Sequence, residues 1–410
     1  MLRTTLAAAL AAALATAANA QHTAALAADI ATPRWLVGGK TAELPLIRLG
    51  TGETLQLSFD AMSHRRRRFT YSIEHCGADW ETSPGIFPSE YAGGFTEGLP
   101  VEDSRQSEGT VTQYTHYSIS MPNADCAPAM SGNYRLTVTD DESGQDVLRA
   151  CFMVAEDAMA VEMEATANTD EGFRTDRQQV SMRLGFGQLR VTSPQRQVKT
   201  AVLQNADWST AEWPQPTYAT AEGMAWEHSP GLIFHGGNEY RKFELLDTDR
   251  PSMGVERTEW DGSAYHAFLW PAEPRPNYSY DEDANGAFYI RNGGHSDDDT
   301  GSEYSTVHFT LPSPPLEGGA YIAGRWAATP QGTHKMEYDN GERAYKASLP
   351  LKQGYYSYKY VSTGVDGKPV PVPSEGDFYQ AENTYHALVY YRGPQDRADR
   401  LVAVGRCRHK

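Results

Sequence analysis

The chain has 410 residues, 40 % of them hydrophobic, and a formal net charge of −17. This length predicts about two to three domains, each with a sizeable core. A chain this acidic would repel phosphate backbones, which argues against nucleic-acid binding.

Residues 1–20 have the layout of a cleaved signal peptide. Arg3 is the charged start, residues 6–18 form a short apolar run, and Ala18-Asn19-Ala20 is a small-x-small cleavage site. A membrane anchor is the alternative, but a spanning helix needs roughly 20 apolar residues. We therefore predict an exported chain that begins at Gln21, does not span a membrane, and has a net charge of −18 once Arg3 is removed from −17.

The rest of the chain has the pattern of an all-β protein. Short alternating runs are broken by Gly, Pro, Asn and Asp, and 23 tyrosines suit pleated surfaces. We predict three consecutive β-sandwich modules of the immunoglobulin-like or early-set type, over residues 21–157, 158–312 and 313–410. The two boundaries are placed within a short stretch at 156–158 that begins with two acidic residues and within the proline-rich stretch 312–315.

The most informative stretch of the first module is FTYSIEHCGADW, residues 69–80. It predicts a half-buried strand that ends in a tight turn carrying Trp80. His75 and Asp79 could act as a base and its orienting carboxylate, with Ser83 as nucleophile. No Gly-x-Ser-x-Gly elbow is present, and His75 continues the apolar face of the strand, so a structural histidine is favoured.

The strand, turn and Trp recur in the other modules. Ala206-Asp207-Trp208 repeats the first turn, and Gly324-Arg325-Trp326 is a third example. In addition, Tyr134 follows Gly132 at the start of a late strand, a placement typical of the tyrosine corner in immunoglobulin-like sandwiches. The recurrence indicates that each module uses a strand, a tight turn and a Trp to pack its core.

Four cysteines, Cys76, Cys126, Cys151 and Cys407, allow three disulfide connectivities in an exported chain. The position of Cys126 and Cys151 near the ends of one hairpin-forming segment favours that pair. The spacings contain no CxxC and do not fit a zinc site. We expect no cofactor and no metal ion.

The second module contains two polar patterns. Residues 281–286, DEDANG, match the opening of a calcium loop, but the twelfth position is Asn292 rather than Glu, so a tight turn is favoured over a calcium site. Glu239 and Arg241 would share one face of a strand, either as a functional pair or as an ion pair. The sequence offers no credible catalytic set, so we predict that the protein is not an enzyme.

The third module resembles early-set sandwich modules that bind glycogen or starch. The matching segments are AYIAGRW (320–326) and GYYSYKY (354–360). The resemblance implies that Trp326 could stack on a sugar. An exported carbohydrate-binding protein is therefore the alternative function.

A broader resemblance runs through nearly the whole mature chain and rests on short blocks in a fixed order. They are HCGADW (75–80), EYAGGF (90–95), YTHY (114–117) with PN (122–123), SGNY (131–134), FMV (152–154), QN (204–205), GNEYR (237–241), NG (285–286), LKQGYY (351–356), ENTY (382–385) and DRL (399–401). The chain resembles the plug protein family of the Bacteroidota type IX secretion system.

This resemblance implies a non-enzymatic protein of the periplasm. It would dock on the outer-membrane translocon barrel and seal its periplasmic mouth when no cargo occupies the pore. A small-molecule substrate is not expected, and the family supplies no catalytic residues. Six residues of the shared blocks are singled out, with a structural or an interface role left open: His75, Asp79, Trp80, Asn238, Glu239 and Arg241.

Overall fold

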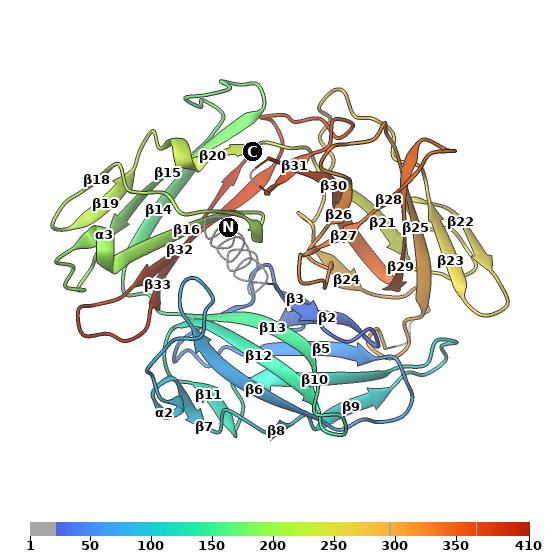
Figure 1. The fold of residues 1–410 in the computed structure, drawn as a ribbon, viewed down its shortest axis with the longest axis horizontal. Helices are drawn as coiled ribbons and strands as arrows, with labels where there is room; N and C mark the ends of the chain where they lie inside the picture. Colours follow the sequence, from blue (N-terminus) through green and yellow to red (C-terminus); the bar gives the residue numbers. More distant parts are fainter. Residues whose placement is uncertain (1–21, 295–296, 366) are drawn as a thin grey trace, which may run out of the picture.

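The computed structural model describes residues 22–294, 297–365 and 367–410, and its regular structure is almost entirely β. The signal peptide expected at residues 1–20 lies outside the described residues. The strands form three sandwiches grouped around a common centre (Figure 1). The predicted all-β fold is thus confirmed. No helix in the described part of the chain has the length and apolar character needed to cross a bilayer.

The first sandwich is built from one continuous stretch of chain. Its elements are β1 (Ala24–Ala25), β2 (Ile30–Val37), β3 (Lys40–Thr41), β4 (Leu46–Arg48), β5 (Leu55–Ala61), β6 (Phe69–Cys76), α2 (Pro88–Tyr91), β7 (Ala92–Gly94), β8 (Leu99–Pro100), β9 (Asp103–Gln106), β10 (Thr115–Met121), β11 (Cys126–Pro128), β12 (Gly132–Asp140) and β13 (Asp146–Ala155). One sheet has the order β1-β13-β12-β6-β8, with β4 along β13. The facing sheet has the order β3-β2-β5-β10-β9, and β7 pairs with β11.

The alternation in β6 explains how this sandwich closes. Phe69, Tyr71 and Ile73 are buried in the core between the two sheets, as period-2 patterning requires. β12 runs antiparallel beside β6 and places Tyr134 opposite His75. The Tyr134 hydroxyl donates to the backbone oxygen of Met130 at 2.8 Å, which confirms the predicted tyrosine corner.

The second sandwich is interrupted by the third. Its elements are β14 (Ala160–Thr166), β15 (Arg177–Gly185), α3 (Pro194–Gln197), β16 (Val198–Gln204), β17 (Asp207–Glu212), β18 (Tyr218–Ala219), β19 (Gly223–Trp226), the 3-10 turn η1 (Pro230–Leu232), β20 (Ile233–His235), β32 (Asn383–Tyr391) and β33 (Arg400–His409). One sheet has the order β14-β15-β19-β18 with β20 beside β15, and the other β17-β16-β32-β33. In Figure 1 the red strands β32 and β33 lie among the green strands of this sandwich.

The third sandwich occupies the chain between β20 and β32. Its strands are β21 (Arg241–Leu245), β22 (Val255–Trp260), β23 (Tyr265–Leu269), β24 (Phe288–Ile290), β25 (Tyr304–Pro312), β26 (Tyr321–Ala323), β27 (Thr333–Lys335), β28 (Glu337–Asp339), β29 (Ala344–Lys352), β30 (Gly354–Thr363) and β31 (Pro369–Pro371). One sheet has the order β21-β30-β26-β27, with β24 and β31 beside β30. The other has the order β22-β23-β25-β29-β28.

This topology corrects the predicted boundary at residues 312–313 and the consecutive order of the last two modules. β25 pairs with β29 along its full length, although the predicted boundary would separate them. β16 likewise pairs with β32 from Val198–Tyr391 to Gln204–Tyr385. The proline-rich stretch ends β25 and leads to β26 within the third sandwich. Local composition marked a loop there, but only long-range pairing reveals which sandwich each strand joins.

The favoured disulfide pair is also corrected. No disulfide joins the four cysteines, all of which lie in the described part of the chain. Cys126 lies in the core of the first sandwich, whereas Cys151 lies in a different sheet and packs toward the second sandwich. Burial raises the pKa of Cys126 to about 11 and that of Cys151 to about 12. Both groups are therefore thiols at neutral pH.

Candidate functional site

The three strand, turn and Trp segments meet where the sandwiches meet. A cavity of about 150 Å³, which we call the junction cavity, is lined by residues of all three sandwiches. Trp80 comes from the turn after β6, Asp207 and Trp208 from the start of β17, and Arg325 from the turn after β26. The sequence repeat therefore converges on one place, a relationship that spacing alone could not reveal.

The turn after β6 attaches the first sandwich to the second. Trp80 is 1 % exposed, and its ring meets Trp208 edge to face with centroids 5.3 Å apart. The backbone N–H of Ala78 donates to Asp399 Oδ2 at 3.0 Å. A Cβ on Gly77 would lie 2.9 Å from Asp79 Oδ1 and 3.2 Å from Asp399 Oδ2, so a side chain there would displace the Asp79 carboxylate and press on that of Asp399.

The same turn does not form the His75–Asp79 pair. His75 is 1 % exposed; its Nδ1 lies 2.8 Å from Ser83 Oγ, and its Nε2 lies 3.1 Å from the Ser131 carbonyl. Burial lowers its pKa, opposed by the Ser131 contact. Asp79 is exposed and accepts a hydrogen bond from the Glu81 N–H at 3.2 Å. His75 and Ser83 are both buried, so no substrate could approach them without local opening.

Asn238 and Arg241 lie where the chain passes from the second sandwich into the third. Asn238 Nδ2 donates to the backbone oxygen of Glu375 at 2.8 Å, and Arg241 Nε donates to Glu375 Oε1 at 2.9 Å. Arg275 binds the other oxygen of the same carboxylate. Glu375 lies between β31 and β32, in the segment that returns to the second sandwich. These hydrogen bonds therefore join the segment that leaves the second sandwich to the segment that returns to it.

Glu239 does not pair with Arg241, and the alternative of a pair between these two is wrong. Its Oε1 accepts hydrogen bonds from the Tyr278 hydroxyl at 2.7 Å and from the Glu382 N–H at 3.1 Å. Burial raises the pKa of Glu239, although both hydrogen bonds act in the opposite direction. Glu239 thus links the third sandwich to the residue before β32.

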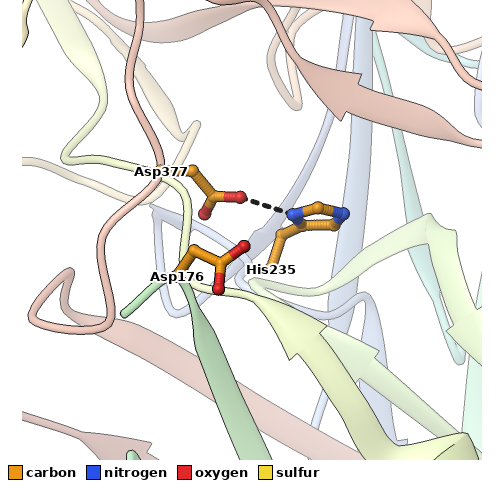
Figure 2. A group of neighbouring side chains, drawn as sticks. All are labelled: Asp176, His235 and Asp377. Carbon is orange, nitrogen blue, oxygen red and sulfur yellow. Dashed lines mark hydrogen bonds and ion pairs between the residues drawn. The ribbon is translucent and has the colours of Figure 1, made fainter. Parts of the chain in front are cut away.

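One group of side chains could hold a metal ion. Asp176, His235 and Asp377 offer ligand atoms that all lie within 4.8 Å of one another, and Figure 2 shows the three side chains converging. His235 Nδ1 lies 2.5 Å from Asp377 Oδ2, and the other oxygen of Asp377 accepts the Gly237 N–H at 2.6 Å. Imidazole and carboxylate groups are common ligands of divalent metals. The three residues are distant in sequence and gave no spacing signal.

The calcium-like loop is a tight turn held by protein groups. Asp281 Oδ1 receives a hydrogen bond from Lys242 Nζ at 2.6 Å. Asp283 accepts the backbone N–H groups of Tyr240 and Asn285. Burial raises the pKa of Asp283 to about 7. The carboxylate oxygens of Asp281 and Asp283 that could bind calcium are therefore largely occupied by protein donors. This agrees with the prediction of a tight turn.

The alternative in which Trp326 stacks on a sugar does not fit the buried position of this ring. Trp326 is 6 % exposed and packs in the core of the third sandwich, edge to face with Tyr356. Its Nε1 donates to the backbone oxygen of Ser357 at 3.0 Å. A sugar needs an open aromatic face, and this ring has none to offer.

Residues 30–156 match the family described as "Type 9 secretion system plug protein 1st domain". A crystal structure of a hypothetical protein from Parabacteroides merdae ATCC 43184 is 32 % identical, with 95 % of this chain and 99 % of that chain covered and a TM-score of 0.90. No curated protein matches.

Two further solved structures have a TM-score of only 0.16 and carry no argument. One is the C-terminal domain of the Streptococcus pyogenes antigen I/II-family protein AspA, at 7 % identity over 92 % of this chain and 98 % of that chain. The other is dimeric latent PorU from Porphyromonas gingivalis, at 10 % identity over 93 % and 33 %.

Proposed function

Since the chain belongs to the type IX secretion system plug protein family, we propose that it is a non-enzymatic periplasmic plug. It docks on the outer-membrane translocon barrel of that system and seals its periplasmic mouth when no cargo occupies the pore. The observation that carries this proposal is the family match over residues 30–156, which lies within the first sandwich.

The way the sandwiches are joined supports a plugging role. A plug has to keep its shape under contact with the pore, and flexible linkers between domains would not provide that. Here buried contacts join the first sandwich to both others: Trp80 packs on Trp208, and Asp60 pairs with Lys352. The signature residues, by this proposal, fix the shape of the body rather than contact the pore themselves.

A non-enzymatic role is part of the proposal. The best catalytic candidates, His75 and Ser83, are both buried and hydrogen-bonded to each other. The carbohydrate-binding alternative depended on Trp326, which is enclosed in the core. No observation therefore favours a second function over the plug.

A capture experiment tests the proposal directly. The chain from residue 21 to residue 410 is immobilised and incubated with detergent-solubilised outer membranes of the host. We expect the type IX translocon barrel to be retained and identified by mass spectrometry, and not retained by an unrelated acidic periplasmic protein used as bait. Deletion of the gene should increase dye leakage across the outer membrane. If the barrel is not retained and leakage does not change, the proposal is wrong.

A further inference from the structure

The junction cavity is lined by N–H donors that have no acceptor. Trp35 Nε1, Trp80 Nε1 and Arg325 Nε lack a hydrogen-bond partner among the described residues, and all three residues line the cavity. Trp35 and Trp80 are 6 % and 1 % exposed. Buried polar groups in folded proteins are almost always satisfied, so three orphaned donors at one cavity need an explanation.

Two cationic side chains line the same cavity. Neither Arg325 nor Lys359 has a carboxylate within 4.0 Å among the described residues. The Arg325 guanidinium donates to the backbone oxygens of Glu43 at 2.8 Å and Ala284 at 3.3 Å. The Lys359 ammonium lies 5.2 Å from the ring centroid of Tyr240. The carboxylates of Glu43 and Asp207 act on Arg325, and that of Asp207 on Lys359, only at a distance and without a direct ion pair.

The two carboxylates that line the cavity are engaged elsewhere. Glu43 Oε2 lies 3.2 Å from Arg406 of β33, and Asp207 Oδ1 accepts the Ser209 hydroxyl at 2.6 Å. The cavity wall therefore has three N–H donors without an acceptor, whereas each of its two carboxylates already has one oxygen in contact with another group. An anion is the ligand class that this imbalance fits.

The other side of the wall is aromatic. Trp35, Trp80, Trp208 and Phe288 contribute rings to the lining. A cavity of about 150 Å³ holds a molecule of about the size of benzene. An inorganic ion would leave most of the aromatic surface without contact.

We propose that the junction cavity binds a small organic carboxylate. Its carboxylate is received by Arg325, Lys359 and the indole N–H groups, and its apolar part packs against the aromatic rings. Because the lining comes from all three sandwiches, the ligand binds the assembled body and not any one part of it. This site is separate from the proposed docking on the translocon, and either could fail without the other.

The first test measures binding to the chain of residues 21–410 by calorimetry and by tryptophan fluorescence. The probes are benzoate, phenylacetate and succinate, with benzamide as the neutral counterpart of benzoate. We expect at least one carboxylate to bind saturably with a stoichiometry of one and to change the fluorescence. Benzamide should bind at least about tenfold more weakly than benzoate. No saturable binding of any carboxylate at millimolar concentration, or equal binding of benzoate and benzamide, would overturn the proposal.

The second test removes one charge at a time. Lys359→Met keeps the length of the side chain but not the ammonium, and should weaken carboxylate binding by about tenfold or more. Lys335→Met changes an exposed lysine on β27 and should leave binding unchanged. Arg325 is avoided because its guanidinium also donates to three backbone carbonyls, those of Ala42, Glu43 and Ala284.

Trp35→Phe gives an independent reading in case Lys359→Met fails to fold. It keeps an aromatic ring while removing one orphaned N–H, so the fold should survive and binding should weaken. Near-ultraviolet circular dichroism checks the fold of each variant. A folded Lys359→Met or Trp35→Phe chain that binds as well as the parent contradicts the assignment of the site.

Discussion

Asp60 of the first sandwich and Lys352 of the third form an ion pair in which Oδ2 and Nζ are 2.6 Å apart and each side chain is 1 % exposed. The Tyr304 hydroxyl also donates to Asp60 Oδ2 at 2.7 Å, and His116 Nδ1 lies 2.7 Å from Oδ1. Burial opposes the charge on Asp60, but Lys352 and His116 together hold its pKa below the usual value. Burial also lowers the pKa of Lys352, against the opposing effect of Asp60, so each partner compensates the burial of the other where the two sandwiches join.

Lys352→Met should destabilise the chain strongly. Removing one partner of a buried ion pair leaves the other charge uncompensated, which typically costs about 3–5 kcal/mol. The urea midpoint of the intact chain reports the loss. Lys346→Met on the same strand is the control: that lysine pairs with Asp339 and Glu342 at the surface, and its removal should leave the midpoint nearly unchanged. Equal midpoints for the two variants would contradict a structural role for the pair.

Trp80→Ala should weaken the packing of the first sandwich against the second and so lower the free energy of unfolding. The substitution removes a fully buried ring and its edge-to-face contact with Trp208, and we expect a loss of about 3–5 kcal/mol of stability. Trp80→Phe should lose less because a smaller ring remains in the interface. Trp270→Ala, at a tryptophan that is 60 % exposed, should change stability by no more than about 0.5 kcal/mol. Denaturant titrations of the three variants decide whether the turn is a packing device.

Asp283→Asn should alter how stability depends on pH. The folded state raises the pKa of Asp283 from 3.8 to about 7 by burial. Between these values the folded chain keeps a proton that the unfolded chain releases, so this group's contribution is full below pH 3.8 and is lost as the pH rises through 7. Asparagine cannot ionise, and its single side-chain oxygen can accept only one of the two N–H groups, a loss that is the same at every pH.

The urea midpoint of Asp283→Asn, relative to the parent, should therefore be higher at pH 8 than at pH 5. Asp298→Asn, at an exposed aspartate, should show no such pH-dependent gain. If the Asp283 variant gains nothing at pH 8, the carboxyl is not protonated in the folded chain.

Two exposed phenylalanines in the first sandwich should contribute to capture of the translocon. Phe87 and Phe95 are 66 % and 70 % exposed and flank the short elements α2 and β7, inside the region that matches the plug family. Exposed aromatic side chains are frequent anchors of protein interfaces. Replacing both with Ser should weaken binding to the purified barrel by about tenfold or more while the fold is retained. Phe173→Ser, at 60 % exposure in the second sandwich, serves as the control.

Local patterns in the sequence were enough to predict individual strands and turns. The alternation from residue 69 located β6, and the Gly-Asn-Tyr block located the tyrosine corner, because both depend on neighbours close in sequence. The prediction that His75 is a structural histidine also agrees with its buried contacts to Ser83 and Ser131. Periodicity reports which face of a strand is apolar, and in these cases that was the deciding information.

Features that depend on contacts between distant segments of the chain could not be predicted from local sequence patterns. Nothing near residue 198 indicates that β16 will pair with a strand ending at Tyr391, so the insertion of the third sandwich was missed. Trp326 follows the same strand-and-turn pattern as Trp80, but the pattern does not say what covers the ring. The junction cavity and the Asp176–His235–Asp377 group likewise depend on segments that only the complete fold brings together.

Because the second sandwich is interrupted by the third, it can complete its folding only after the third has been made. The first and third sandwiches each contain a continuous stretch of chain and can close as soon as that stretch emerges. β16 has to wait for β32, and β32 for β33, which ends at His409. Until the last residues arrive, the nascent chain carries an unpaired sheet edge of the kind that templates aggregation. Chains cut short before β33 would thus leave one edge of β32 unpaired and would be prone to aggregate.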